Sequence, residues 1–78
     1  MECKFLYTIE LTKDMYGNQK VIAMFEALSG IRLLWSTTVN SKALKAMQIG
    51  ETYNLKWTEV AKLSENDYKV ERVHIIWL

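Results

Sequence analysis

The stretch from Val39 to Leu55 most constrains the fold, because it is the part of the chain that interrupts a long run of strand-like sequence. It reads VNSKALKAMQIGETYNL and predicts one short helix. Asn40 or Ser41 can accept a hydrogen bond from the first free backbone amides, and Gly50 can take a left-handed turn at the other end. Between these ends lies an apolar stripe at helical spacing, formed by Ala43, Leu44, Ala46 and Met47.

Five segments alternate between apolar and polar residues with the period of two that is typical of strands. They span Lys4–Thr12, Lys20–Leu28, Ile31–Val39, Glu51–Leu63 and Tyr68–Leu78. The order strand, strand, strand, helix, strand, strand is that of the OB-fold, a small five-stranded Greek-key barrel. We therefore expect an all-β, OB-fold-like barrel with one short helix. It forms a single domain over residues 1–78, because half of such a chain is too small to bury a core.

The apolar residues exceed what one small barrel can bury. The expected core comprises Phe5, Tyr7, Ile9, Leu11, Val21, Phe25, Leu33, Trp35, Leu44, Met47, Tyr53, Leu55 and Trp57. A phase slip between Thr58 and Val60 predicts a bulge or bend. The first three strands are also apolar in their second phase, and the last strand ends in an apolar run. This surplus predicts an interface at Ile22, Met24, Leu34, Ile76 and Leu78.

The sequence contains no recognisable catalytic or metal-binding motif. His74 is the single histidine and Cys3 the single cysteine, and neither has a partner at a spacing typical of a metal site or an activated nucleophile. The three glycines form no phosphate-binding loop. We therefore expect a protein that is not an enzyme and that needs no cofactor or metal.

The cysteine usage and the N-terminal segment favour a cytoplasmic protein. One cysteine cannot form a disulfide within the chain, as is usual in a reducing compartment. The first residues carry Glu2, Lys4 and Glu10 instead of an apolar signal segment, and no stretch approaches the ~20 apolar residues of a membrane span. We expect no membrane partner. If the protein is encoded by a phage, we expect it in the cytoplasm of the host cell.

Binding of single-stranded nucleic acid requires cations for the phosphates and aromatic faces on which bases stack. The net charge of +1 leaves only a local basic patch for this purpose. The candidates are Tyr16, Lys20, Arg32, Lys56, Tyr68, Lys69 and Arg72. In an OB-fold the segments that carry them border the face of the second and third strands. The loop tyrosines can also simply cover the barrel ends, and the phase of Trp35 and Trp57 favours the core.

The segments FEALSGIRLLWSTT, LKAMQIGETYNLKWTEVAKL and YKVERVHI resemble the latter part of small OB-fold proteins related to single-stranded-DNA-binding modules, including short ones encoded by phages. The matching features are the Gly30 turn before Leu34 and Trp35, Gly50 before Tyr53 and Leu55, and the last strand around Arg72 and Val73. The resemblance implies binding of single-stranded DNA or RNA, with DNA favoured over RNA, often in replication or recombination and frequently as oligomers.

The chain differs from that family in its low net charge and in lacking an acidic tail, which favours a narrow accessory role. The alternative is a protein-interaction or homo-oligomerisation module of the same fold that binds no nucleic acid. Fold alone does not decide between the two.

Overall fold

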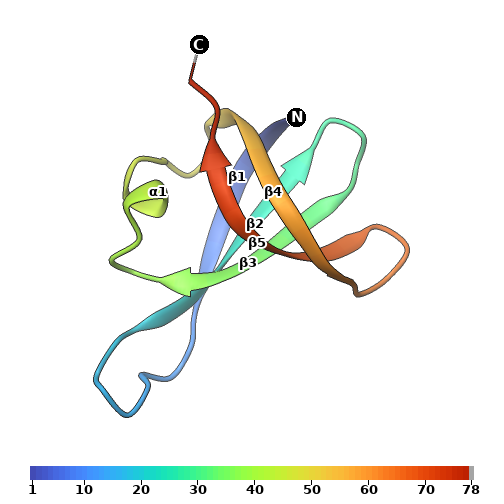
Figure 1. Ribbon diagram of the computed structural model, residues 1–78. Coiled ribbons are helices and arrows are strands. Elements are labelled where there is room, and N and C mark those ends of the chain that lie inside the picture. Colours follow the sequence, from blue (N-terminus) through green and yellow to red (C-terminus); the bar gives the residue numbers. More distant parts are fainter. Residues whose placement is uncertain (78) are drawn as a thin grey trace.

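The computed structural model describes residues 1–77 and is a closed barrel of five strands with one short helix (Figure 1). The elements are β1 (Glu2–Glu10), β2 (Lys20–Ala27), β3 (Arg32–Thr38), α1 (Lys42–Lys45), β4 (Thr52–Lys62) and β5 (Asp67–Ile75). Around the barrel the strands follow the order β1-β2-β3-β5-β4, with β3 and β5 parallel and the other neighbouring strands antiparallel. The predicted all-β, OB-fold-like architecture is confirmed.

The helix α1 is one turn long. Ser41, one of the two predicted capping residues, is the N-cap, because its hydroxyl oxygen accepts a hydrogen bond from the Leu44 amide at 3.3 Å. Gly50 does not end the helix, however. It adopts φ +93° in the turn before β4, where its amide donates to the Phe5 carbonyl at 2.7 Å and so begins the pairing of this segment with β1. Within residues 1–77, no helix is long and apolar enough to cross a membrane.

One apolar core fills the barrel. Its members are Cys3, Phe5, Ala23, Phe25, Ala27, Leu33, Trp35, Met47, Leu55, Val70 and Val73. The rings of Phe5 and Phe25 face each other across β1 and β2 with centroids 5.1 Å apart. Tyr53, Trp57 and other half-buried residues pack against the margin of this core. The helix supplies Leu44 to the margin, and Met47 from the following turn is buried at the barrel end.

A bulge in β1 changes which side chains face the core. Phe5 pairs with Phe25, but the next paired residue, Tyr7, is opposite Met24, so Leu6 is an extra residue in β1. A slip of one residue turns the rest of the strand to its other face. The core prediction is therefore wrong for three residues of this segment that are exposed: Tyr7, Ile9 and Leu11.

The strand ends also differ from the sequence pattern. β1 stops at Glu10 and β3 at Thr38, because the chain leaves the barrel there to form the loop and the helix turn. β5 stops at Ile75, two residues before the end of the described chain. The predicted phase slip in β4 is confirmed by register shifts between Lys56 and Thr58 and between Glu59 and Ala61.

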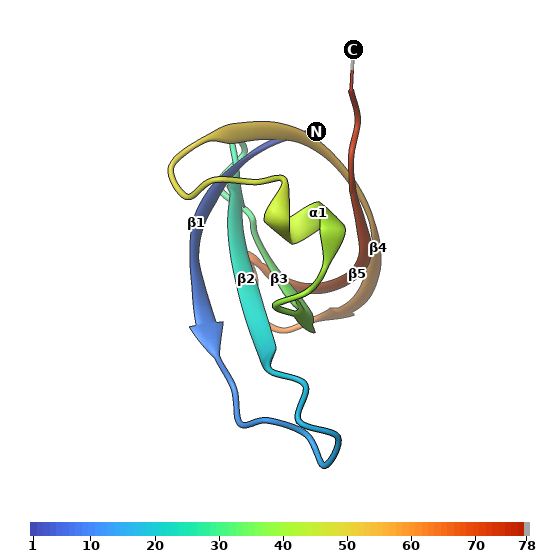
Figure 2. The same ribbon diagram turned by 90° about the vertical axis from the view of Figure 1, so that its left-hand side faces the viewer.

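In the view turned by 90° from Figure 1, β1 and β2 lie on one side of α1, and β4 and β5 lie on the other (Figure 2). The β1–β2 hairpin extends beyond the barrel as an arm that ends in the loop around Tyr16 (Figures 1 and 2). The outer sides of these two strand pairs are therefore separate surfaces.

The core assignment predicts a large difference between two leucine substitutions. Leu33 is completely buried and Leu28 is 85% exposed. Leu33→Ala should lower the free energy of unfolding by about 2–5 kcal/mol, because it removes core contacts and leaves a cavity. Leu28→Ala, the matched control, should change it by less than about 0.5 kcal/mol. Urea denaturation followed by circular dichroism measures both, and similar losses in the two variants would contradict this core.

Candidate functional site

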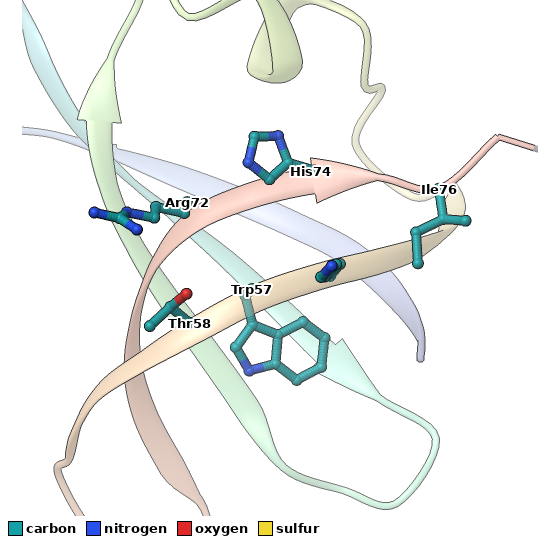
Figure 3. A pocket seen from close by; sticks show the side chains of 6 residues that line it. Trp57, Thr58, Arg72, His74 and Ile76 are labelled. Carbon is teal, nitrogen blue, oxygen red and sulfur yellow. The ribbon is translucent and has the colours of Figure 1, made fainter.

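Three cavities that share lining residues lie along β4 and β5, and we call them together the β4–β5 groove. Figure 3 shows the side chains that line the first cavity, and the second is lined by residues of the helix region and of the end of β5. The first has a volume of about 360 Å³, shares His74 with the second and shares Trp57 with the third. The basic and aromatic residues that line the groove are Lys42, Lys56, Trp57, Arg72, His74 and Trp77. Among the residues the structure describes, no Asp or Glu lines it. The groove is therefore locally basic on a protein of nearly neutral net charge.

A second bulge directs Arg72 and His74 into this groove. The register of β4 and β5 shifts between Lys56 and Thr58, and β5 has one residue more than β4 at this point. Arg72 has φ +54°, a left-handed conformation that costs a non-glycine residue about 1–2 kcal/mol. The bulge keeps Val73 in the core while Arg72 and His74 project from β5 on the outside (Figure 3).

Within residues 1–77, no carboxylate forms an ion pair with the cations of the groove. In the described residues the one ion pair joins Arg32 Nε to Glu26 Oε2 at 3.5 Å, outside the groove. Lys56 and Arg72 are exposed and have no carboxylate partner in this part of the chain. Glu71, which precedes Arg72, lines none of the three cavities. These side chains are thus free to bind an anionic ligand.

The three tryptophans differ in exposure. Trp35 lies in the core, Trp57 is half-buried on β4, and Trp77 is 72% exposed beyond the end of β5. Trp57 packs against the core margin and also lines the groove, whereas Trp77 lines the part of the groove next to Lys42 of α1. The groove therefore combines two indoles with its basic side chains.

The predicted nucleic-acid residues do not all meet at one place. Lys56 and Arg72 share the first cavity of the groove. Tyr68 is half-buried at the core margin, and the Nζ of Lys62 lies 5.8 Å from its ring centroid. Lys69 lines a cavity on a different surface, described below.

Tyr16 and Lys20 line none of the three cavities of the groove. Tyr16 is 82% exposed in the loop, and Lys20 is exposed at the start of β2. Asp14 fixes the loop by accepting hydrogen bonds from the backbone amides of Asn18 at 3.0 Å and Tyr16 at 2.9 Å. These bonds, first that of Asn18, lower the pKa of Asp14 below its usual value, so the loop is held by a carboxylate and loosens as the pH falls through that pKa.

The outer side of the first three strands is apolar. Met24 pairs with Tyr7 on one side and with Leu34 on the other, and Ile22 pairs with Ile9. Leu63, which follows β4, lines a cavity with Ile22, Leu34, Ser36 and Lys69. We call Tyr7, Ile9, Ile22, Met24, Leu34 and Leu63 the β1–β3 face. Met24 is buried although it lies outside the core cluster, because its outer neighbours cover it.

The predicted interface residues divide between the two surfaces. Ile22, Met24 and Leu34 lie together on the β1–β3 face, as expected from their strand phase. Ile76 lines the β4–β5 groove instead. Leu78 lies outside the described residues.

Sequence reasoning did not assign Lys42, Trp57, His74 or Trp77 to a binding site. Strand phase favoured the core for Trp57. The apolar neighbours of Trp77 at the end of the sequence favoured an interface or a plug of the barrel end for that residue. The signal that could have identified the groove is the presence of basic residues in both strands of the last hairpin, KW in β4 and RVH in β5, with a second tryptophan, Trp77, just after β5. Whether these side chains point to the same surface depends on the bulge at Arg72, and the sequence pattern does not show where that bulge lies.

The described residues give no metal centre. Within residues 1–77, no group of three or more His, Cys, Asp or Glu side chains is placed to hold a metal ion. Cys3 is 1% exposed, and burial raises the pKa of its thiol, so it is a packing residue in the folded protein.

The bulge gives a testable difference between two substitutions of Arg72. Both Arg72→Gly and Arg72→Ala remove the guanidinium, but only glycine adopts positive φ without steric cost. Arg72→Gly should be more stable than Arg72→Ala by about 1 kcal/mol in the free energy of unfolding. Thermal and urea unfolding measure the difference. An alanine variant as stable as the glycine variant would show that residue 72 is not held in the left-handed conformation.

No protein-family model, curated protein or solved structure matches this chain.

Proposed function

We propose that this protein binds single-stranded nucleic acid along the β4–β5 groove, without catalysis. The observation that supports the proposal best is the composition of the groove: lysine, arginine and histidine side chains lie beside two tryptophans, with no carboxylate from the described residues in the lining. Phosphate binding and base stacking are the two interactions that such a ligand needs.

The charged side chains provide the phosphate contacts. The Arg72 guanidinium has a planar set of donors that can bind two phosphate oxygens at once. Lys56 lies directly opposite His74 in the strand register and adds a flexible ammonium beside the imidazole donor. Because these groups are exposed, binding releases counterions and weakens as salt rises.

The tryptophans provide the stacking contacts. An indole face binds any base, and each stacked base contributes about 1–3 kcal/mol. The exposed Trp77 is free to change its rotamer for a base, whereas the half-buried Trp57 offers a fixed surface. Recognition of this kind tolerates different sequences, and it suits DNA and RNA, of which the family resemblance favours DNA.

The groove is short and the overall charge is close to zero, which suits an accessory protein better than one that coats long strands. The resemblance to single-stranded-DNA-binding modules supports a role in replication or recombination, in the cytoplasm of the cell or of a phage host. In such a compartment the buried Cys3 stays reduced.

The second candidate function is a protein-interaction module that binds no nucleic acid. The apolar β1–β3 face favours it, since three of its residues are 45% exposed or more: Tyr7, Ile9 and Leu63. This function predicts no association with any oligonucleotide at low salt, where electrostatic attraction is strongest.

Matched substitutions locate the nucleic-acid site. Arg72→Ala and Lys56→Ala should each weaken binding of a labelled single-stranded oligonucleotide and reduce the slope of log K against log salt by about 0.7, the value per phosphate on a single strand. Fluorescence anisotropy at several salt concentrations measures both effects.

Arg32→Ala and Lys69→Ala are the controls, because they remove the same charges from the outer side of β3 and β5. They should leave the salt slope unchanged. The reverse result, with loss confined to Arg32→Ala and Lys69→Ala, would assign binding to the face of the second and third strands.

Two aromatic substitutions, which leave the charges unchanged, test the contribution of base stacking to binding. Trp77→Ala removes an exposed indole and should weaken oligonucleotide binding by about tenfold at every salt concentration, because stacking is not screened. Tyr16→Ala removes a similarly exposed ring from the β1–β2 loop and should have little effect. Equal losses in the two variants would contradict a stacking role specific to the groove.

A further inference from the structure

We propose that the β1–β3 face is the contact surface of a symmetric homodimer. The inference is independent of nucleic-acid binding, because the face and the β4–β5 groove share no lining residue. The partner is a second copy of this chain, because the order of charges beside the apolar residues is complementary to itself.

A row of charged side chains crosses four strands next to the apolar face. By register, Lys4 on β1 is opposite Glu26 on β2, Glu26 is opposite Arg32 on β3, and Arg32 is opposite Asp67 on β5. Their buried neighbours Phe5, Phe25 and Leu33 point inward, so these side chains point outward. The signs along the row are plus, minus, plus, minus.

The next row is apolar and ends in a cation. Tyr7, Met24 and Leu34 are in register on β1, β2 and β3, and Lys69 follows on β5. Ile9 and Ile22 continue the apolar surface in the row beyond. The charged row can pair within its own chain. In the apolar rows Met24 is buried, but Tyr7 and Ile9 on β1 are each 45% exposed.

This pattern is self-complementary. A two-fold axis in the plane of the contact, parallel to the strands and between β2 and β3, reverses the order of each row. It places Glu26 opposite Arg32 of the second copy, Lys4 opposite its Asp67, and Met24 opposite its Leu34. Because a barrel wall is curved, the closest contacts lie on β2 and β3, where the apolar pair and the Glu26–Arg32 pairs meet. Every charge of the charged row then faces its opposite across the axis. In the next row Met24 covers Leu34 of the second copy, and Tyr7 lies opposite its Lys69.

The order of charges allows a complementation test with two variants. In a dimer of the Glu26→Arg variant, arginines face each other across the axis, and in a dimer of the Arg32→Glu variant, glutamates do. Each variant alone should dimerise at least about tenfold more weakly than the wild type, because like charges face each other. An equimolar mixture should recover the dimer, since one copy then carries two arginines and the other two glutamates. Sedimentation equilibrium measures the mass in each case.

Leu34→Lys provides a second disruption on the apolar row and should give a monomer with the circular dichroism of the wild type. Arg72→Ala should leave the dimer intact, so a failure of the nucleic-acid proposal leaves this test unaffected. A wild type that is monomeric at submillimolar concentration would overturn the proposal and leave the face to a different partner. Variants that stay dimeric alone, or a mixture that stays monomeric, would overturn the two-fold arrangement.

Discussion

The closure of a five-stranded barrel around one small core is the constraint on which the rest of this structure depends. The strands must bend sharply to close, and the chain does so by shifts of register in β1, β4 and β5. Each shift exchanges the inner and outer faces of the residues that follow. The same adjustments that complete the core around Phe25 and Leu33 therefore decide what the protein presents to its surroundings.

The two outer surfaces follow from two such shifts. The extra residue at Leu6 turns Tyr7 and Ile9 outward and joins them to Ile22 and Met24, which creates an apolar face. The bulge at Arg72 has the opposite chemical result, because it turns cations outward beside the tryptophans of the last hairpin. On a protein of charge +1, this segregation gives one surface suited to phosphates and another suited to a protein.

The sequence pattern predicted the element order, the OB-fold-like barrel, most of the core, the Ser41 cap and the irregularity in β4, because these depend on local periodicity and capping. It wrongly placed Tyr7, Ile9 and Leu11 in the core. The bulge that turns this segment lies at Leu6, between two other apolar residues, so it leaves no mark in the alternation of polar and apolar residues there. It identified Lys56 and Arg72 as binding candidates but grouped them with Lys69 and Tyr16. The register of the strands decides which basic side chains lie close together, and this register is fixed by packing across the barrel.

The central claim, that nucleic acid lies in the β4–β5 groove, is tested most directly by the three indole N–H signals in an NMR titration with a single-stranded oligonucleotide. Trp57 and Trp77 line the groove, and Trp35 in the core is an internal reference. The account predicts saturable shifts of the Trp57 and Trp77 indole signals and of the His74 amide, with the Trp35 indole and the amides of Ile22 and Leu34 unchanged. Shifts confined to β2 and β3, or no shifts at low salt, would contradict it.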